Sequence, residues 1–305
     1  MRIVFFGSGS FAVPSLKALA DSVTLVVSQP DRPAGRGMRP RPSPVKAAAV
    51  ASGLEVGTPE RCGDLEFLAR VASENADALV VAAYGQILPE SLLRAARMGG
   101  INLHASALPK YRGAAPIQRA ILAGETETGV ALMQMDKGMD TGDVIALEAT
   151  DIGPDETASE LQERLAAIAA RLAKEWLPRI CSGDYPRKPQ DHGIATLAPR
   201  VSKSEAELSF DRAAQSEYDR FRAFTDSPGA FLRTSRGNLG VLAARCSTVS
   251  GAPGEVLAVS PELCVAFSGG SLRLLTVRPP GKNAMSGRDL ANGWRLRPGS
   301  ELGNE

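Results

Sequence analysis

Residues 102–116 read NLHASALPKYRGAAP. An apolar run leads into Asn102 and His104, and the proline, glycine and arginine residues that follow cannot continue a strand. Because residues i and i+2 of a strand point to one face, Asn102 and His104 converge at the carboxyl end of a strand predicted over 100–104. Open α/β sheets bind their ligands at that end. We therefore expect a functional site here, although a lone histidine is more often a hydrogen-bonded structural residue.

A second stretch, MDKGMDTGD at residues 135–143, contains acidic residues in a glycine-punctuated turn. Such residues can simply cap and turn the backbone. However, His104 is one of only two histidines, and a carboxylate that reached it would complete a set of Asn, His and Asp. This set suits acyl transfer, because an amide can stabilise an oxyanion while the imidazole moves the proton of an attacking amine. No nucleophilic serine or cysteine is then required.

Residues 102–118 resemble the signature of the folate-dependent formyltransferases, and the Asp-Thr-Gly-Asp turn at 140–143 matches the second motif of that family. Over its whole length the chain resembles the methionyl-tRNA formyltransferases. The resemblance implies transfer of the formyl group of 10-formyltetrahydrofolate to the amine of methionine on initiator tRNA. It also implies that Asn102, His104 and Asp140 are the catalytic residues.

The same resemblance assigns two loops to the folate. One follows an apolar strand predicted over 78–83, where glycine and large aliphatic residues could equally form core and turn. The other reads Ser-Ala-Leu-Pro where the family usually has Ser-Leu-Leu-Pro, a loss of apolar volume near the folate. The folate-binding residues implied are Tyr84, Gly85, Ile87, Leu88, Ser106, Ala107, Leu108 and Pro109.

A long connection, PDRPAGRGMRPRPSP at residues 30–44, carries four arginines against the single acid Asp31. Loops of this length are usually functional or disordered, and a solvated flexible loop is the plain alternative to a phosphate-binding one. The segment resembles the tRNA-contacting insertion of the methionyl-tRNA formyltransferases, in which the position of Arg36 senses the acceptor stem. The tRNA-binding residues implied are Arg32, Arg36, Arg39 and Arg41, with Lys282 in the C-terminal part of the chain.

The elements predicted from periodicity alternate between strands and helices, which is typical of a doubly wound, mostly parallel, Rossmann-like sheet. A strand pair over 129–135 and 144–148 flanks the acidic turn, and a helix after the capping box at 157–160 closes this part near Cys181. The other predicted elements are strands over 1–6, 23–28, 78–83 and 100–104, and helices over 43–52, 65–74, 91–98 and 116–123.

After the elements of this sheet, the sequence predicts a helix over 213–224 and then short strand-like runs separated by glycine and proline. This pattern indicates a small β-barrel, and the resemblance implies an OB-like domain that supports tRNA. We expect a catalytic domain over 1–182, a linker over 183–201 and the OB-like domain over 202–305. The predicted runs are 237–243, 254–259, 263–267 and 272–277, followed by a short helix over 287–292.

The composition is that of an ordinary globular protein, with 44% apolar and 23% charged residues among 305 and a formal net charge of +1. Any nucleic-acid surface must therefore be a local patch. The four cysteines are scattered and only two histidines accompany them, so we expect no metal site and reduced thiols. No segment approaches the length of a membrane span. We predict a cytoplasmic monomer that does not bind membranes.

Three alternatives remain open. A folate formyltransferase acting on a small amine, such as a ribonucleotide or an amino sugar, would need the same catalytic stretch. A nucleotide-binding or RNA-binding module without catalysis would not need Asn102, His104 and Asp140. A nicotinamide oxidoreductase is suggested by Gly7 and Gly9 after the first strand, although a tight turn explains these glycines better.

Overall fold

The computed structural model describes residues 1–34 and 39–303 and divides the chain into two compact units. Unit 1 comprises residues 1–116, 127–151 and 162–199. Unit 2 comprises residues 117–126, 152–161 and those from Arg200 onward.

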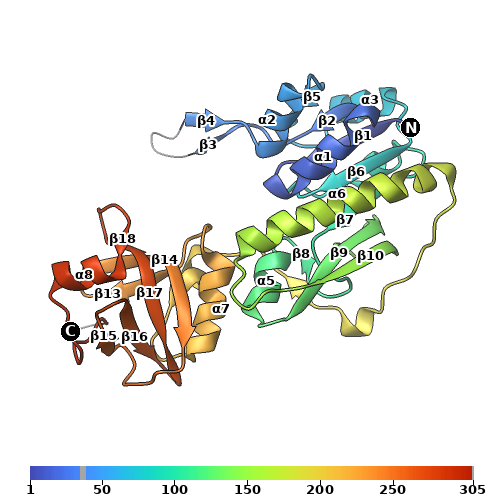
Figure 1. The fold of residues 1–305 in the computed structure, drawn as a ribbon. Coiled ribbons are helices and arrows are strands. Elements are labelled where there is room, and N and C mark those ends of the chain that lie inside the picture. Colours follow the sequence, from blue (N-terminus) through green and yellow to red (C-terminus); the bar gives the residue numbers. More distant parts are fainter. Residues whose placement is uncertain (35–38, 304–305) are drawn as a thin grey trace. The chain divides into compact units, whose positions relative to one another are not determined.

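Unit 1 is built on a seven-stranded sheet with the order β10-β9-β7-β6-β1-β2-β5 (Figure 1). Its central strands are continuous apolar runs because both faces of a parallel sheet are covered. The pairs on the β1 side of β7 are parallel, whereas β9 runs antiparallel to β7 and to β10. The predicted mostly parallel sheet is confirmed. The strands are β1 (Ile3–Gly7), β2 (Val23–Val27), β5 (Val56–Gly57), β6 (Ala78–Ala82), β7 (Gly100–His104), β9 (Glu127–Gln134) and β10 (Val144–Asp151).

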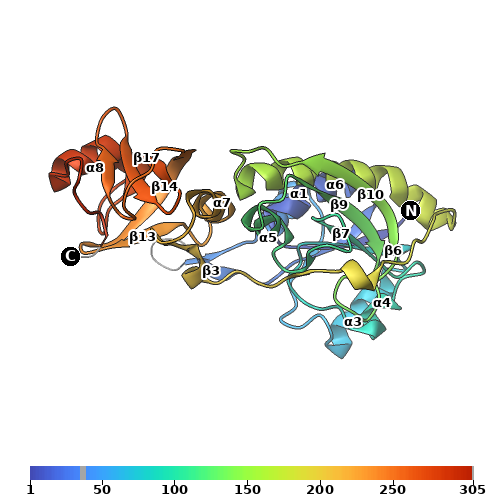
Figure 2. The same cartoon turned by 90° about the horizontal axis from the view of Figure 1, so that it is seen from below.

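Helices cover both faces of this sheet (Figure 2). Successive side chains of β1 point to opposite faces of the sheet. Val4 and Phe6 share one face, where they pack with Phe67 of α3 and Leu92 of α4. The opposite face is covered by α1, α2 and the part of α6 that belongs to unit 1. The helices of unit 1 are α1 (Val13–Leu19), α2 (Pro44–Ala51), α3 (Leu65–Ser73), α4 (Glu90–Leu93) and the greater part of α6 (Ala158–Ser182), with 3-10 turns at Ser10–Ala12 and Ala20–Ser22. The helix α5 (Pro116–Leu122) lies in unit 2 except for its first residue.

The helix predicted over 91–98 is shorter than expected, since α4 ends at Leu93. The backbone N–H groups of Arg97 and Met98 donate to the carbonyl oxygens of Ala76 and Asp77, at 3.2 and 2.8 Å. These bonds tie the chain to the segment that leads into β6. Tertiary hydrogen bonds therefore replace the helical ones that local periodicity predicts.

The arginine-rich connection contains a short hairpin in which β3 (Arg32–Ala34) pairs antiparallel with β4 (Arg39–Arg41). Arg39 and Arg41 are exposed, and Arg32 forms a 3.8 Å ion pair with Glu60. Arg36 lies outside the described residues. A paired hairpin base was not predicted, because prolines within it obscure the strand pattern.

The turn after β1 is closed by protein groups. The N–H groups of Ser8 and Gly9 both donate to the carbonyl oxygen of Ala83 at 3.1 Å, and the Ser8 hydroxyl donates to the carbonyl of Tyr84 at 3.0 Å. In a dinucleotide site such N–H groups would face a pyrophosphate. The structural interpretation of Gly7 and Gly9 as a tight turn is therefore favoured.

Unit 2 contains a curled, mostly antiparallel sheet with the order β12-β13-β14-β17-β16-β15, and β18 adds to β17. Its core gathers Tyr218 and Phe221 of α7 with Val265, Leu274 and other apolar residues of the sheet. The prediction of a small β-barrel behind a helix is confirmed in the form of a half-barrel, since the strand order of the described residues runs from β12 to β15. The elements are β12 (Glu207–Leu208), α7 (Ala214–Phe224), β13 (Phe231–Thr234), β14 (Gly237–Ser247), β15 (Val256–Ala258), β16 (Leu263–Phe267), β17 (Gly270–Arg278), β18 (Met285–Ser286) and α8 (Gly287–Trp294).

Residues 183–199 differ from the linker that the sequence predicts, because they group with unit 1. Lys188 forms an antiparallel bridge with Val144, and β11 (Leu197–Ala198) pairs with β8 (Arg112–Gly113). We call residues 183–199 the strap. The sequence of the strap does not predict these contacts, because its prolines and glycines interrupt any strand pattern and its pairing partners lie far away along the chain.

None of the helices in residues 1–34 and 39–303 is long and apolar enough to cross a membrane.

Glu205 lies in the 3-10 turn Lys203–Ala206 of unit 2, and its carboxyl makes the free energy of unfolding depend on pH in the acidic range. Its hydrogen bond from Arg119, at 2.6 Å, and one from the Ser202 N–H lower the pKa of its carboxyl from 4.5 to about 2. A carboxyl whose pKa is lower in the folded than in the unfolded state stabilises the fold at a pH above its unfolded pKa. This contribution is lost as the pH falls from the unfolded pKa toward the folded pKa. Glu205→Gln should lower the free energy of unfolding by about 1 kcal/mol at neutral pH, after allowance for solvent screening, and by less near pH 3.

Urea unfolding of both proteins from neutral to acidic pH checks this result. Glu262→Gln is the control, because it removes an exposed ion pair with Arg273 that should contribute little. A penalty for Glu205→Gln that stayed constant with pH would contradict the assignment.

Candidate functional site

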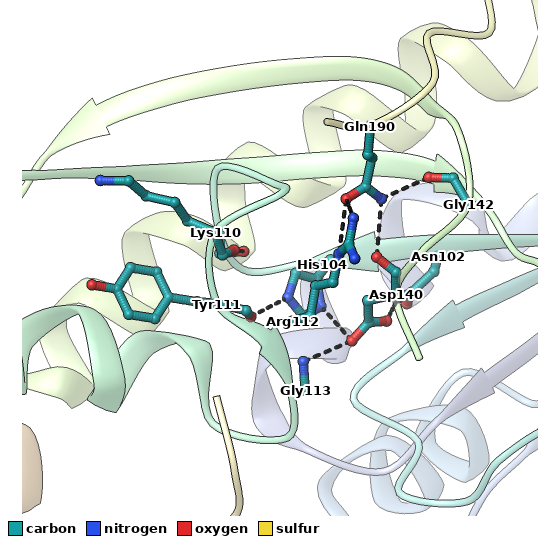
Figure 3. Close-up of polar contacts among 10 residues, drawn as sticks. Asn102, His104, Lys110, Tyr111, Arg112, Gly113, Asp140, Gly142 and Gln190 are labelled. Atoms are coloured by element: carbon teal, nitrogen blue, oxygen red, sulfur yellow. Dashed lines mark hydrogen bonds and ion pairs between the residues drawn. The ribbon is translucent and has the colours of Figure 1, made fainter. Parts of the chain in front are cut away.

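The structure brings Asn102, His104 and Asp140 together, as the sequence predicts (Figure 3). Asn102 and His104 lie two residues apart at the carboxyl end of β7 and are 9% and 6% exposed. Asp140 belongs to the loop 135–143 between β9 and β10. The Asn102 amide nitrogen donates to Asp140 Oδ1 at 3.1 Å, and Asp140 Oδ2 lies 3.6 Å from His104 Nδ1.

The hydrogen bonds of His104 assign its tautomer. Its Nε2 lies 2.9 Å from the carbonyl oxygen of Tyr111, which can only accept a hydrogen bond. Nε2 therefore carries a proton, and Nδ1 is the nitrogen left to exchange one. Nδ1 faces Asp140 at a distance longer than a hydrogen bond, so Tyr111 supplies the closer orienting contact.

The Asn102 amide has two N–H groups, and the bond to Asp140 uses one of them. The second N–H is not engaged by that carboxylate oxygen. The bond to Asp140 also fixes which end of the amide faces the loop, because a carboxylate oxygen accepts and the amide oxygen cannot donate.

Asp140 adopts a left-handed backbone conformation with φ of 53°. For an L-residue this conformation costs roughly 1 to 2 kcal/mol, although Asp tolerates it better than most. Its Oδ2 accepts from the backbone N–H of Gly113 at 2.9 Å, while Oδ1 accepts from Asn102. Both oxygens are thus held by donors from other segments of unit 1.

Two buried polar side chains that the sequence did not reveal support this cluster. Gln190 of the strap donates through Nε2 to the carbonyl oxygens of Asp140 and Gly142, at 2.9 and 2.7 Å. Its Oε1 accepts from Arg112 Nε and Nη2, at 3.1 and 2.7 Å. Arg112 lies within the stretch quoted first, but no local pattern connects it with a glutamine 78 residues away.

Gly113 is required by its backbone. It has φ of 128°, and a Cβ there would lie 2.6 Å from the carbonyl oxygen of Ala198 in β11. Gly113→Ala should therefore destabilise the protein by about 2 to 4 kcal/mol and weaken the hold on Asp140, which thermal unfolding and kcat would both report.

Gly183→Ala is the matched control, because Gly183 also has a positive φ of 83° but has nothing within 4 Å of an added Cβ. It should lose only about 1 to 2 kcal/mol and keep its kcat. Equal effects of the two substitutions would show that the close approach of the strap to Gly113 is unimportant.

Two family models together match most of the chain. The model described as "Formyl transferase" matches residues 1–179, and "Formyl transferase, C-terminal domain" matches residues 200–295. The chain belongs to the formyltransferase family.

Relatives of this formyltransferase match it from end to end. A protein of Sorangium cellulosum named methionyl-tRNA formyltransferase is 46% identical over 310 residues, covering 99% of this chain and 100% of the relative. One of Thermus thermophilus with the same name is 44% identical over 306 residues, covering 99% of each chain.

Solved structures share the fold. An N-formyltransferase from Helicobacter canadensis, in complex with folinic acid and dTDP-3-aminofucose, has a TM-score of 0.67 at 19% identity, over 90% of this chain and 98% of its own. HypX from Aquifex aeolicus, in complex with tetrahydrofolic acid, has a TM-score of 0.64 at 16% identity, over 100% of this chain and 48% of its own.

The formyltransferase loop predicted to bind folate after β6 has mixed exposure. Tyr84 and Leu88 are buried in the core beside α3 and α4, and Phe6 packs edge-on against the Tyr84 ring. Burial raises the pKa of Tyr84, whose hydroxyl has no hydrogen-bond partner among the described residues. Ile87 is 87% exposed, and Gly85 has open space around it.

The second predicted folate loop packs more tightly. The Ser106 hydroxyl is buried and donates to the carbonyl oxygen of Lys110 at 2.6 Å. Leu108 packs with Ala131 and Met133 of β9. Ala107 is half-buried and so lies at the surface of the loop, where a leucine would add apolar area.

The predicted tRNA residues of the formyltransferase are on the surface where they are described. Arg32, Arg39 and Arg41 lie on the hairpin β3–β4, and Lys282 lies in the exposed turn before β18. Their role in binding tRNA stays a prediction, as does that of Arg36.

A shallow hollow beside α4 is separate from the Asn102–His104–Asp140 cluster. Arg94, Arg97 and Lys137 contribute to its lining, together with Gly100 at the first residue of β7. His104 is the last residue of that strand, about 13 Å along it. Over residues 1–34 and 39–303, His, Cys, Asp and Glu form no group of three that could hold a metal ion.

Proposed function

We propose that this formyltransferase transfers the formyl group of 10-formyltetrahydrofolate to the amine of methionine esterified to initiator tRNA, forming N-formylmethionyl-tRNA. We further propose that it acts in the cytoplasm as a monomer. The convergence of Asn102, His104 and Asp140 supports the chemistry. End-to-end similarity to proteins named methionyl-tRNA formyltransferase supports the acceptor.

The two loops after β6 and β7 fit a folate donor. Ile87 offers an exposed apolar side chain, and the backbone at Gly85 is open to a flat heterocycle. Ala107 and Pro109, both half-buried, would border the same ligand from the other loop. The folate supplies the formyl group, and the protein supplies binding, orientation and charge stabilisation.

In the transfer, the methionyl nitrogen bonds to the formyl carbon, and the bond from that carbon to N10 of the folate breaks. The carbonyl oxygen carries negative charge in the intermediate. We assign the second N–H of Asn102 to this oxygen, because the first is held by Asp140. Alignment of the two substrates itself can supply roughly 7 to 11 kcal/mol in favourable cases.

The attacking amine must lose a proton, and the leaving N10 must gain one. His104 Nδ1 is the ring position able to exchange a proton, since Nε2 is bonded to the carbonyl of Tyr111. Asp140 Oδ2 faces Nδ1 and stabilises the imidazolium when the ring is protonated. We propose that the proton passes along this pair, with water completing the path.

Formyl transfer assays test the acceptor directly. Methionyl initiator tRNA, uncharged tRNA, free methionine and an amino sugar nucleotide would each be offered with 10-formyltetrahydrofolate. Transfer to the charged tRNA alone is expected. Transfer to the sugar instead would move the proposal to a small-amine formyltransferase, a class whose fold this chain shares.

The same assay tests the exposed hairpin. Arg39→Ala together with Arg41→Ala should raise KM for tRNA and reduce its salt dependence by about one logarithmic slope unit per lost phosphate contact. The charge-matched control is the double variant Arg94→Ala/Lys174→Ala. Both residues are exposed, and Arg94 directly follows α4 whereas Lys174 lies in α6. Equal effects of the two pairs would argue against a specific role for the hairpin.

A further inference from the structure

Gln190 joins the strap to the loop that carries Asp140. Its single amide nitrogen donates to two loop carbonyls, those of Asp140 and Gly142, and its exposed fraction is only 8%. These bonds hold the backbone on both sides of Thr141. The Asp140 backbone is in the left-handed region, which an L-residue leaves readily unless neighbouring contacts hold it.

The loop has little room to adjust. A Cβ on Gly142 would lie 1.9 Å from the carbonyl oxygen of Gln134, so the loop backbone packs directly on the end of β9. A shift of the loop would move the Asp140 carboxylate relative to Asn102 and His104. Misplacement of a reacting group by about 1 Å can lower a rate a hundredfold.

Arg112 determines which way the Gln190 amide points. A guanidinium can only donate, and a carbonyl can only accept. The Gln190 oxygen must therefore face Arg112, and its nitrogen must face the loop. The reversed amide would place donors against Arg112 and an acceptor against the carbonyls of Asp140 and Gly142, losing all four contacts.

The strap is anchored on both sides of Gln190. Before it, Lys188 bridges to Val144, and the Tyr185 hydroxyl donates to Gln134 Oε1 at 3.2 Å. After it, β11 pairs with β8, which contains Arg112 itself. Gln190 is thus presented to the loop by a segment tied to both flanks of the catalytic cluster.

We propose that Gln190, oriented by Arg112, is a positioning residue for formyl transfer and acts by holding Asp140 against Asn102 and His104. This positioning role rests on the proposed function, because it takes formyl transfer as the reaction. Gln190 touches no reacting atom, so it should influence kcat through Asp140 and leave the binding of both substrates unchanged.

Gln190→Glu tests the proposal in the whole protein. Glutamate keeps the size of the side chain and the contact with Arg112, but it replaces the donor to the loop by an oxygen that repels the two carbonyls. We expect kcat to fall about tenfold to a hundredfold with little change in KM for either substrate. Gln162→Glu, which alters a hydrogen bond to Ser10 outside the catalytic cluster, should retain kcat.

The double variant Gln190→Glu/Asp140→Asn separates positioning from general support. If Gln190 acts through Asp140, the double variant is no slower than Asp140→Asn alone. Multiplication of the two losses, or a wild-type kcat for Gln190→Glu, would overturn the proposal.

Hydrogen exchange gives a readout that does not depend on the acceptor. Amides of residues 136–143 should exchange at least about tenfold faster in Gln190→Glu, while those of β9 and β10 keep their protection. Unchanged exchange in this loop would overturn the positioning role even if formyl transfer to methionyl-tRNA were confirmed. Failure of wild-type transfer with faster loop exchange would instead count against the proposed acceptor.

Discussion

Asp140→Asn should lower kcat about a hundredfold to ten thousandfold. The substitution preserves shape but removes the charge that faces His104 Nδ1. It also creates a mismatch, because Asn102 Nδ2 and the Gly113 N–H each donate to a different oxygen of the carboxylate. An amide has only one oxygen, so one of these two donors would meet an NH2 group.

Single-turnover formyl transfer with saturating donor and tRNA measures this effect without product release. The matched control is Asp143→Asn in the same turn, whose carboxylate pairs with Arg187 at the surface. Asp143→Asn should stay close to the wild-type rate. Equal losses in the two variants would show that the turn matters only as structure and would remove Asp140 from the mechanism.

Asn102→Ala should lower kcat about a hundredfold to a thousandfold, the usual effect of removing one oxyanion donor. The substituted side chain loses the N–H assigned to the developing oxyanion. Binding of methionyl-tRNA should be unchanged, since an oxyanion donor acts mainly in the transition state. Rate and affinity are therefore expected to separate in this variant.

Filter binding of charged tRNA and single-turnover kinetics on the same preparation test that separation. Asn102→Ala also removes a hydrogen bond to Asp140, so a stability loss of about 1 kcal/mol is expected and thermal unfolding should report it. Asn238→Ala, at an exposed position of β14, is the control. A wild-type rate for Asn102→Ala would remove the oxyanion assignment.

Local sequence patterns were enough to predict the sheet of unit 1 and the half of its site that Asn102 and His104 form. Continuous apolar runs predicted the parallel strands, because such strands are buried on both faces. The spacing of Asn102 and His104 placed both side chains on one face at the end of β7, since strand geometry is fixed within a few residues. The strand pair around Asp140 was also evident from its own residues.

Contacts between distant segments determined the rest. The tautomer of His104 depends on a carbonyl in the turn at Tyr111, and the conformation of Asp140 depends on donors from Gly113 and Gln190. The strap resembles a linker in the sequence because its order comes from pairing with β8 and Val144, not from its own periodicity. The sequence alone therefore determined the strands and the chemical types at their ends. The tertiary structure decided which donors hold them, because hydrogen bonds between segments tens of residues apart leave no local pattern.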